Sequence, residues 1–415
     1  MHKKLLHFAG AIAFATLLFG CNSKPTNQAK SAPLKLEPGF SATIVADSLG
    51  SARHLAVNKS GDIYIKLGAL KDGKGIYCLS DTDGDGIVDQ TSSFGNYPGT
   101  GILIKDDYLY TSSNTTVYRY KLDKNQKVIN DKQPEVIVTG LVARAVDGSK
   151  PMVIDDNNNL YVAVASYSDA CKNETTDGKS CPLLDSVAGI WQFKADKPNQ
   201  SYTDAVRFAT GLKGVVGFAW NDISKSLFAM HHGRGAFHEN YPQYFDAAYS
   251  AKFPAETMYE LTQGADAGWP YIYYDQVQHK QLQAPEFGGD GKKESDRKYL
   301  DPVMAFPAHL GPNDMLFYTG NMFPEKYKNG AFIAFHGQST EIHKGFCVAF
   351  VPFKDGKPSG DWEIFADDFA GVDLAHPTGP SQHKPCGLAQ GPDGALYVSD
   401  DLQGTVYRIA YKGKS

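Results

Sequence analysis

The sequence predicts an all-β fold, a six-bladed β-propeller. The main observation is a repeated pattern of an apolar strand, a polar turn and an alternating strand, which is clearest in Gly387 to Ile409 (GLAQGPDGALYVSDDLQGTVYRI). In this copy a Pro-Asp-Gly turn joins the first two strands and a third strand follows, which is most of one propeller blade. Repeats of about 50 residues with this content are typical of propellers.

Five earlier segments match the same pattern. They are Leu55 to Leu67, Gly101 to Tyr120, Met152 to Ala165, Gly217 to Met230 and, with a longer turn, Met315 to His336. Together with the last copy they predict six inner hairpins, one for each blade. The long intervals 165–217 and 230–315 are then expected to hold outer strands and large loops, where sites on a rigid scaffold are usually built.

The composition fits one closed domain, which we place at residues 35–413. The chain has 415 residues, of which 42% are hydrophobic and 12% aromatic, enough for a large core. Lys and Arg number 41 against 46 Asp and Glu, so the net charge is -5. Because no basic stripe follows any segment, we expect no nucleic-acid partner.

The first residues predict a lipoprotein signal peptide, residues 1–20. Two lysines and an apolar run precede Gly20 and Cys21, an arrangement similar to a bacterial lipobox. The alternative is an ordinary secretory signal. We expect Cys21 to be lipidated and residues 21–34 to form a polar, flexible tether. The protein is then exported and anchored to a bacterial membrane, on its periplasmic or cell-surface side, and touches the membrane only through this lipid.

Export makes disulfides possible, and one pair of cysteines predicts a bridge. Cys171 and Cys181 flank the polar loop CKNETTDGKSC, which has no apolar side chains with which to order itself. Cys347 and Cys386 lie in apolar, strand-like runs instead. We expect these two to be small buried hydrophobic residues.

Residues 81–89 (DTDGDGIVD) match the first nine positions of a calcium-binding loop. Carboxylates occupy alternate positions, at Asp81, Asp83, Asp85 and Asp89. Gly86 falls at the sharp turn, but the twelfth position is Ser92, so the usual bidentate Glu is missing. Two interpretations stay open: a weak calcium site, or an Asp-Gly hairpin made rigid by Asx turns.

Aligning the repeats also predicts a ligand site at one mouth of the central channel. The positions just before each inner strand include Arg53, His54, Lys150, Lys213, Asn313 and Lys384. Four of the six blades contribute a Lys or Arg there, which should attract a ligand with several negative charges. The alternative is that each of these long side chains simply points into water.

Several longer segments occur in order along the chain. They are GADAGWPYIYYD (264–275), APEFGGDGK (284–292), HLGPNDMLFYTGNMFPEKYKNGAFIAFHG (309–337), VPFKDGKPSGDWEIFADDFAG (351–371) and the closing repeat. Together they resemble the sorbosone dehydrogenase-like branch of the soluble pyrroloquinoline quinone (PQQ) sugar dehydrogenases, from about Leu36 to Tyr411. The resemblance implies a six-bladed propeller with PQQ and calcium at the channel mouth. The three carboxylates of PQQ suit a ring of Lys and Arg.

The resemblance implies oxidation of a sugar, aldose or related aldehyde. Hydride passes to the quinone, a base takes the hydroxyl proton, calcium polarises the quinone oxygen, and an external acceptor removes the electrons. The expected cofactor-binding residues are Arg53, Lys150, Lys213, Arg234 and Lys384. Calcium is expected on the backbone carbonyls of Gly233 and Arg234, and Trp269 is expected to brace the wall of the site.

The chain departs from the family at the base. Family members present a histidine in a run similar to HGAKP, whereas this sequence has DGSKP at 147–151 and no histidine between 142 and 152. An unperturbed Asp is about 2.6 pK units less basic than His. Either Asp147 is a slower base, or His309 or His232 replaces it, or the redox chemistry has been lost.

Three functions are therefore considered. The preferred one is a PQQ- and calcium-dependent sugar or aldehyde dehydrogenase. The second is a ligand-binding propeller without catalysis, which the replacement at Asp147 favours. The third is a metal-dependent, lactonase-like hydrolase, because six-bladed propellers host those too. It ranks last because such a site needs acidic or Asn side chains around an axial metal, whereas this mouth is predicted to be cationic.

Overall fold

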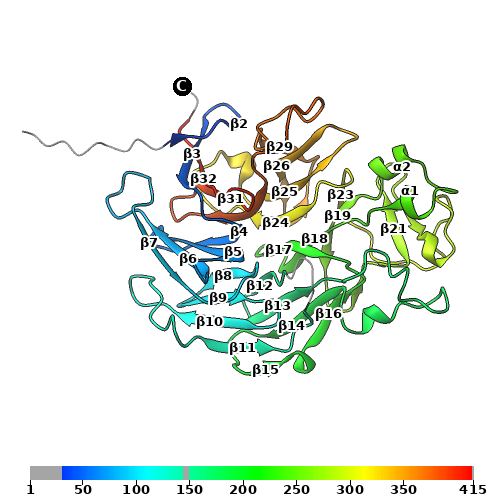
Figure 1. The fold of residues 1–415 in the computed structure, drawn as a ribbon, viewed down its shortest axis with the longest axis horizontal. Coiled ribbons are helices and arrows are strands. Elements are labelled where there is room, and N and C mark those ends of the chain that lie inside the picture. The colour runs from blue at the N-terminus through cyan, green and yellow to red at the C-terminus, as the bar shows by residue number, and fades with distance from the viewer. Residues whose placement is uncertain (1–29, 144–148, 414–415) are drawn as a thin grey trace, which may run out of the picture.

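The protein folds as a ring of six antiparallel sheets around a central axis (Figure 1). The structure, a computed structural model, describes residues 30–143 and 149–413. Strands make up nearly all of its regular structure, so the predicted fold class is confirmed. Each of the six repeated segments forms the first two strands of one sheet, as the pattern predicted.

We number the blades 1 to 6 by the order of their inner strands, which surround the channel. The inner strands are β4 (Ala52–Val57), β8 (Ile102–Lys105), β12 (Met152–Ile154), β17 (Val215–Asn221), β24 (Pro312–Phe317) and β30 (Pro385–Gln390). The second strands are β5 (Ile63–Lys71), β9 (Tyr108–Ser112), β13 (Asn159–Val164), β18 (Ser226–His231), β25 (Ala331–Ser339) and β31 (Leu396–Asp400). The third strands are β6 (Lys74–Ser80), β10 (Val117–Lys121), β14 (Gly189–Lys194), β19 (Glu256–Leu261), β26 (Lys344–Val351) and β32 (Val406–Tyr411). The outer strands are β7 (Gln90–Phe94), β11 (Glu135–Thr139), β16 (Val206–Thr210), β23 (Met304–Phe306), β29 (Glu363–Asp367) and β3 (Phe40–Ala46).

Short elements extend or connect the blades. The edge strands are β1 (Lys30–Ser31), β2 (Lys35–Leu36), β15 (Gln200–Ser201) and β20 (Ala265–Asp266). Two small hairpins consist of β21 (Ile272–Asp275) with β22 (Lys280–Gln283) and of β27 (Phe353–Lys354) with β28 (Lys357–Pro358). The helices are α1 (Phe237–Asn240), α2 (Ala247–Lys252) and four 3-10 turns at Pro182–Asp185, Tyr202–Asp204, Pro285–Phe287 and Glu325–Tyr327.

The N-terminal segment closes the ring. β3 pairs with β32, from Phe40 opposite Tyr411 to Ala46 opposite Val406. β2 pairs with β29, so the same segment also binds blade 5. An aromatic cluster fills the space between these blades and includes Phe40, Phe323, Tyr327, Phe332 and Phe365. Closure therefore joins the two ends of the chain through both hydrogen bonds and core packing.

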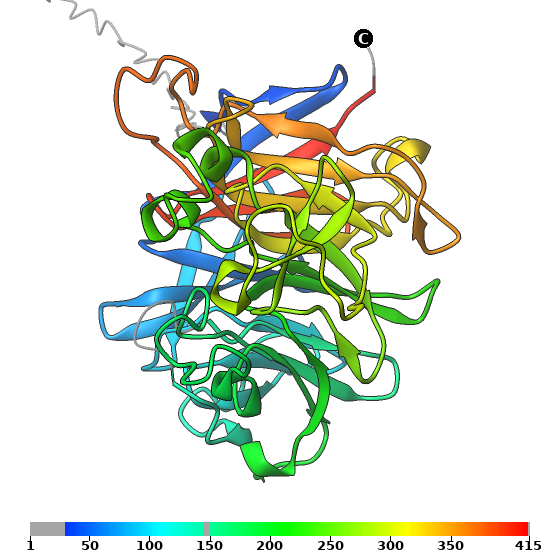
Figure 2. The same cartoon turned by 90° about the vertical axis from the view of Figure 1, so that its right-hand side faces the viewer.

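Residues 232–303 join β18 to β23. Apart from β19, the third strand of the blade, they form a long insertion. It holds α1, α2 and the β21–β22 hairpin, which lie beside blade 4 at the right of Figure 1. Figure 2 turns this side toward the viewer. The insertion has its own small core of Phe237, Phe245, Phe253, Tyr273 and Leu282. It therefore packs as a subdomain on the propeller.

In the part of the chain that the structure describes, no helix is long and apolar enough to span a membrane. The predicted signal peptide (1–20) and Cys21 lie outside the described residues, as does most of the tether (21–34). The lipid anchor stays a prediction.

Below one of its mouths, most of the side chains that line the channel are apolar. We call the upper mouth the end at which the six inner strands begin. A cavity of about 240 Å³ beneath it is lined by inner-strand side chains, among them Ile102, Met152 and Phe218. A second cavity, of about 400 Å³, lies toward the opposite end, beside Trp220. The inner-strand residues that carry charge are found mainly at the upper mouth.

One buried lysine carries a prediction about stability. Lys66 of β5 is fully buried, and its Nζ donates to the carbonyls of Gly75 (3.1 Å) and Tyr97 (2.5 Å). Burial lowers the pKa of Lys66 to about 7. The neutral amine has two N–H donors, which match these two carbonyl acceptors.

The free energy of unfolding should therefore rise with pH between 7 and about 10, by about 1.4 kcal/mol per pH unit from this group. The sign follows because the folded state releases the Lys66 proton near pH 7, whereas the unfolded chain keeps it until about 10.5. Urea unfolding of wild type and Lys66→Met at pH 7, 8 and 9 measures the slope. Equal slopes in the two proteins would contradict the assignment.

Candidate functional site at the upper mouth

The upper mouth brings together cations from four blades. Arg53 lies in β4, and Lys150, Lys213 and Lys384 precede β12, β17 and β30. Because all inner strands begin at this end, the four residues share one mouth, as the aligned repeats predicted. The structure adds carboxylates that sequence analysis did not place there.

Arg53 belongs to a network that spans four blades. Its Nε donates to Thr100 Oγ1 (3.2 Å) and its Nη1 pairs with Asp401 Oδ2 (3.2 Å). Asp401 Oδ1 also contacts His336 Nε2 at 2.7 Å. Burial raises the pKa of Asp401, but His336 and Arg53 together hold it below its ordinary value. The Asp401 carboxylate therefore fixes the Arg53 side chain at the mouth.

Lys213 is paired as well. Its Nζ donates to Asp169 Oδ1 (2.7 Å) and to the backbone carbonyl of Gly233 (2.6 Å). Asp169 Oδ2 accepts the N–H of Gly235 at 2.9 Å. The Gly233 carbonyl was expected to bind calcium. In the structure it accepts a hydrogen bond from the Lys213 ammonium instead.

Lys150 is buried, and its Nζ donates to Asn114 Oδ1 at 3.0 Å. The neighbouring Ser149 is buried too, and its Oγ has no hydrogen-bond partner within residues 30–143 and 149–413. A buried hydroxyl without a partner is costly. Ser149 Oγ therefore offers a hydrogen bond to a ligand at this mouth. Asp147, the expected base, lies outside the described residues.

Lys384 differs from Arg53 and Lys213. Among the described residues it has no carboxylate partner, and its Nζ lies 5.5 Å from the centre of the Phe346 ring. The preceding His383 contacts the buried Asp400 through Nδ1 at 2.7 Å. Asp400 also accepts the Lys384 backbone N–H (2.8 Å), so the backbone of this pair is held firmly while the Lys384 ammonium stays available.

The Arg234 side chain makes contacts other than the expected cofactor contact. Its guanidinium pairs with Glu286 at 2.5 Å, and the two side chains are only 4% and 1% exposed. It also lies 4.5 Å from the centre of the Phe237 ring. Arg234 lies at the start of the insertion, next to the turn at Gly233, and Glu286 lies further along it, so this buried ion pair ties the body of the insertion to its start beside the mouth.

The two histidines proposed as bases occupy different places. His232 follows β18 at the mouth, and its Nε2 contacts the Pro312 carbonyl at 2.8 Å. His309 Nε2 contacts the carbonyl of Ser250 in α2 at 2.7 Å. His309 therefore helps to hold the insertion. His232 lies beside the segment that holds Lys213, because its backbone N–H donates to the Gly214 carbonyl at 2.9 Å.

His54 and Asp314 form the floor of the mouth. His54 Nε2 lies 2.8 Å from the Asn313 carbonyl and 4.0 Å from Asp314 Oδ2. Asp314 is buried, and burial raises its pKa. Both residues also line the cavity below, where most of the other lining side chains are apolar. The floor thus lies between the charged mouth and the part of the channel lined mainly by apolar side chains.

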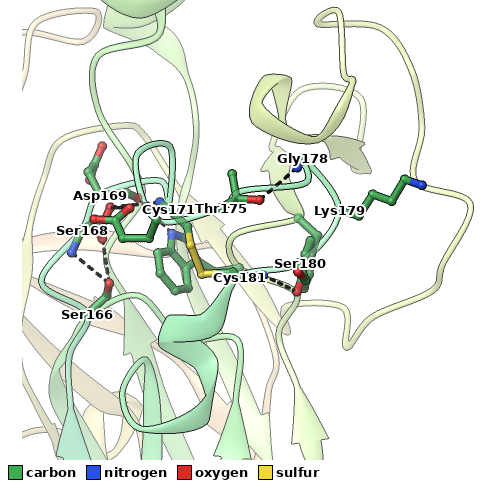
Figure 3. Close-up of a disulfide and its surroundings, with 12 residues drawn as sticks. Ser166, Ser168, Asp169, Cys171, Thr175, Gly178, Lys179, Ser180 and Cys181 are labelled. Atoms are coloured by element: carbon green, nitrogen blue, oxygen red, sulfur yellow. Dashed lines mark hydrogen bonds between the residues drawn. A yellow bond between two sulfur atoms is a disulfide. The ribbon is translucent and has the colours of Figure 1, made fainter.

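The loop after β13 supplies Asp169 and is held by the predicted disulfide. Cys171 and Cys181 are bridged, which confirms that prediction (Figure 3). Trp269 is buried and donates from Nε1 to the Asp169 carbonyl at 2.9 Å, so it braces this wall as expected. Cys347 and Cys386 are buried free cysteines, also as expected.

The 81–89 loop joins β6 to β7 and lies at the opposite end of the propeller from the upper mouth. Asp81, Asp83 and Asp89 are exposed, and one oxygen of each lies within 4.8 Å of the others. The Asp81 carboxylate accepts the N–H groups of Gly84 and Gly86. These contacts suit both interpretations of the loop, so calcium at Asp81, Asp83, Asp85 and Asp89 stays a prediction.

Comparisons with known proteins identify a family for this chain and several solved structures with the same fold. A family model described as TrAA12-like matches residues 34–412. A protein of Borreliella burgdorferi, described as uncharacterized, is 22% identical over 397 residues, 91% of each chain. Among solved structures, a Trichoderma reesei protein of carbohydrate-active enzyme family AA12 has a TM-score of 0.74 at 17% identity and covers 92% of this chain and 99% of its own. The holo form of a Coprinopsis cinerea pyranose dehydrogenase PQQ domain has 0.70 at 18% identity, covering 91% and 97%. The PQQ-bound aldose sugar dehydrogenase of Streptomyces coelicolor has 0.54 at 16%, covering 90% and 100%.

The buried ion pair generates a testable prediction. Replacing Glu286 by Gln leaves the Arg234 charge buried without a counter-ion, which should destabilise the insertion by about 3–5 kcal/mol. Hydrogen exchange in residues 237–300 measures this, because a subdomain can open without the propeller. Lys298→Ala is the matched control, since Lys298 pairs with Asp301 while 86% exposed and should cost less than about 1 kcal/mol. Equal protection in both variants would contradict an anchoring role.

Proposed function

Because the chain belongs to the TrAA12-like family, whose model matches residues 34–412, we propose that it is a PQQ-dependent dehydrogenase of a sugar, aldose or related aldehyde. Support comes from neighbours of the same fold, two of which are described as a holo PQQ domain and a PQQ-bound sugar dehydrogenase. Membership of the sorbosone dehydrogenase-like branch stays a prediction.

The observation that carries this proposal is the donor set at the upper mouth. Within the described part of the chain, Lys384 in blade 6 has no carboxylate partner, and the buried Ser149 Oγ in blade 3 has no hydrogen-bond partner. Two blades lie between them on either side, so they face each other across the ring. A rigid ligand with carboxylates at both ends would satisfy both groups.

These residues fit PQQ, which carries three carboxylates. Arg53, Lys150 and Lys384 would bind its carboxylates, and Ser149 Oγ would donate a further hydrogen bond. When bound, PQQ supplies the quinone that accepts a hydride. Asp401 and Asn114 keep Arg53 and Lys150 in fixed positions, so little side-chain entropy would be lost on binding.

The chain must also remove a proton from the substrate hydroxyl. His232 is at the mouth, and when its Nε2–H donates to the Pro312 carbonyl, Nδ1 is the nitrogen that can accept a proton. Asp147 is adjacent in sequence to the cofactor-binding segment and is the other candidate. His309 is less suitable because it contacts α2 of the insertion.

Calcium at Gly233 and Arg234 does not fit this arrangement, because the Gly233 carbonyl accepts the Lys213 ammonium. We therefore assign no step to calcium at the mouth.

We further propose that the protein is an exported lipoprotein that passes electrons to an external acceptor. The Cys171–Cys181 bridge supports an oxidising compartment, where such bonds persist.

The second candidate is a propeller that binds an anionic ligand without oxidising a substrate. Two observations favour it: the histidine missing between 142 and 152, and the carboxylates already paired with Arg53 and Lys213. The hydrolase has no such support. Among the described residues, the group of acidic or His side chains close enough to share a metal lies in the 81–89 loop, away from the mouth.

PQQ binding can be measured directly. Titrating the purified protein with PQQ, followed by quinone absorbance, should give saturable binding, and Lys384→Ala should weaken it by about 10- to 100-fold, since a charged hydrogen bond is worth about 1.5–3 kcal/mol. Lys298→Ala, a change of an exposed lysine outside the mouth, should leave the affinity unchanged. Failure of the wild type to bind would reject the PQQ-dependent function.

Dye reduction against a panel of aldoses and polyols then tests the base. If His232 is the base, His232→Gln should lower kcat by about 100-fold or more, with little change in PQQ affinity, and Asp147→Asn should have a small effect. The reverse result would assign the base to Asp147. PQQ binding without turnover of any substrate, with turnover restored in Asp147→His, would establish the non-catalytic alternative.

A further inference from the structure

We propose that the ammonium group of Lys213 takes the place of a divalent cation at the upper mouth. The proposal rests on the proposed function for the role of the mouth, but its evidence is the set of contacts around Lys213. The Nζ atom lies 2.7 Å from Asp169 Oδ1 and 2.6 Å from the Gly233 carbonyl oxygen. A carboxylate and a backbone carbonyl are the oxygen ligands that calcium takes in proteins.

Both oxygen atoms are held in place by other contacts. Asp169 Oδ2 accepts the Gly235 N–H at 2.9 Å, and its backbone carbonyl accepts Trp269 Nε1 at 2.9 Å. The Gly233 N–H donates to the buried Glu256 at 2.9 Å. The turn at Gly233 and the loop before the disulfide therefore present the two oxygens as a preformed site for a cation.

The lysine is directed into this site by its own backbone. The Lys213 N–H donates to His231 Nε2 at 2.9 Å, and its carbonyl accepts the Ser166 N–H at 2.7 Å. His231 is itself buried, so the acceptor of this bond is held in place. Backbone hydrogen bonds to blades 3 and 4 thus fix the Lys213 backbone independently of the contacts that its ammonium makes.

The electrostatics of the site are those of an occupied cation site. The Lys213 ammonium pairs with the Asp169 carboxylate at 2.7 Å and supplies the positive charge that these oxygens would otherwise take from a metal ion. A divalent ion could not bind the same two oxygens unless the ammonium left them, because the two cations would repel one another at close range.

It follows that the chain needs no divalent metal at this position, and that removing the ammonium should create a place for one. The variant Lys213→Met keeps a side chain of similar length without the charge, and leaves Asp169 and Gly233 with unpaired oxygens. The experiment starts from a parent in which Asp83→Asn and Asp89→Asn remove two carboxylates of the distant 81–89 loop, so that calcium there does not contribute.

Calcium binding to the full chain is then measured by isothermal titration and by Tm with calcium or with a chelator. The parent should show no calcium-dependent change. Lys213→Met should bind calcium and gain about 2 °C or more in Tm at saturating calcium, and Asp169→Asn in the same background should abolish the gain. Lys384→Met is the matched control, because it removes a mouth lysine that has no carboxylate partner among the described residues, and it should gain nothing.

Two results would overturn the proposal. One is calcium binding to the parent that Asp169→Asn abolishes, since the metal would then bind with Lys213 present. The other is the absence of any calcium gain in Lys213→Met, because the two oxygens would then not form a cation site. Lys213→Gln provides the same comparison if the Met variant does not fold. None of these measurements requires PQQ or a substrate, so a failure here is distinct from a failure of the proposed dehydrogenase function.

Discussion

The structure depends on the close approach of neighbouring inner strands at the upper mouth. Three repeats begin with a glycine, Gly101, Gly217 and Gly387. A Cβ on each would lie 2.3 Å from the Lys150 carbonyl, 2.6 Å from the Asp314 backbone and 2.5 Å from the Arg53 carbonyl, respectively. Any larger residue would push two blades apart. Tight packing at three of the blade junctions therefore draws Arg53, Lys150 and Asp314 toward one mouth.

The mouth gathers several positive charges and is still stable, because carboxylates from neighbouring blades pair with them. A ring of cations alone would repel itself, and the structure offsets that repulsion with carboxylates from neighbouring blades. Asp401 pairs with Arg53, and Asp169 pairs with Lys213. Each pair bridges two blades, so the electrostatic contacts also strengthen the ring. Unlike Arg53 and Lys213, Lys384 has no such partner among the described residues, which is why it carries the most weight in the proposed ligand site.

The insertion between blade 4 strands shows how a site can be modified without altering the propeller. Its small core holds it together, and the buried Arg234–Glu286 pair ties it to its own start beside the mouth. Two residues that sequence analysis assigned to chemistry, Arg234 and His309, stabilise the insertion instead. Both residues lie next to glycine-rich turns or strand starts. A residue that anchors the insertion and a residue that binds a ligand can both occupy such a position in the sequence. Only the position of the partner, Glu286 or Ser250, distinguishes the two roles.

The sequence by itself determined the architecture, because strand alternation and turn chemistry are local properties that repeat. It also determined which residues stand at the upper mouth, since a residue that precedes an inner strand has one place in a closed ring, and it determined the Cys171–Cys181 bridge because the two cysteines close a short loop. The tertiary structure alone decided how the charges are paired. Asp401 and His336 come from segments far from Arg53 in the sequence, and Asp169 reaches Lys213 and Gly233 across a blade boundary. Such pairs leave no periodic signal, because they depend on where separate loops meet in space.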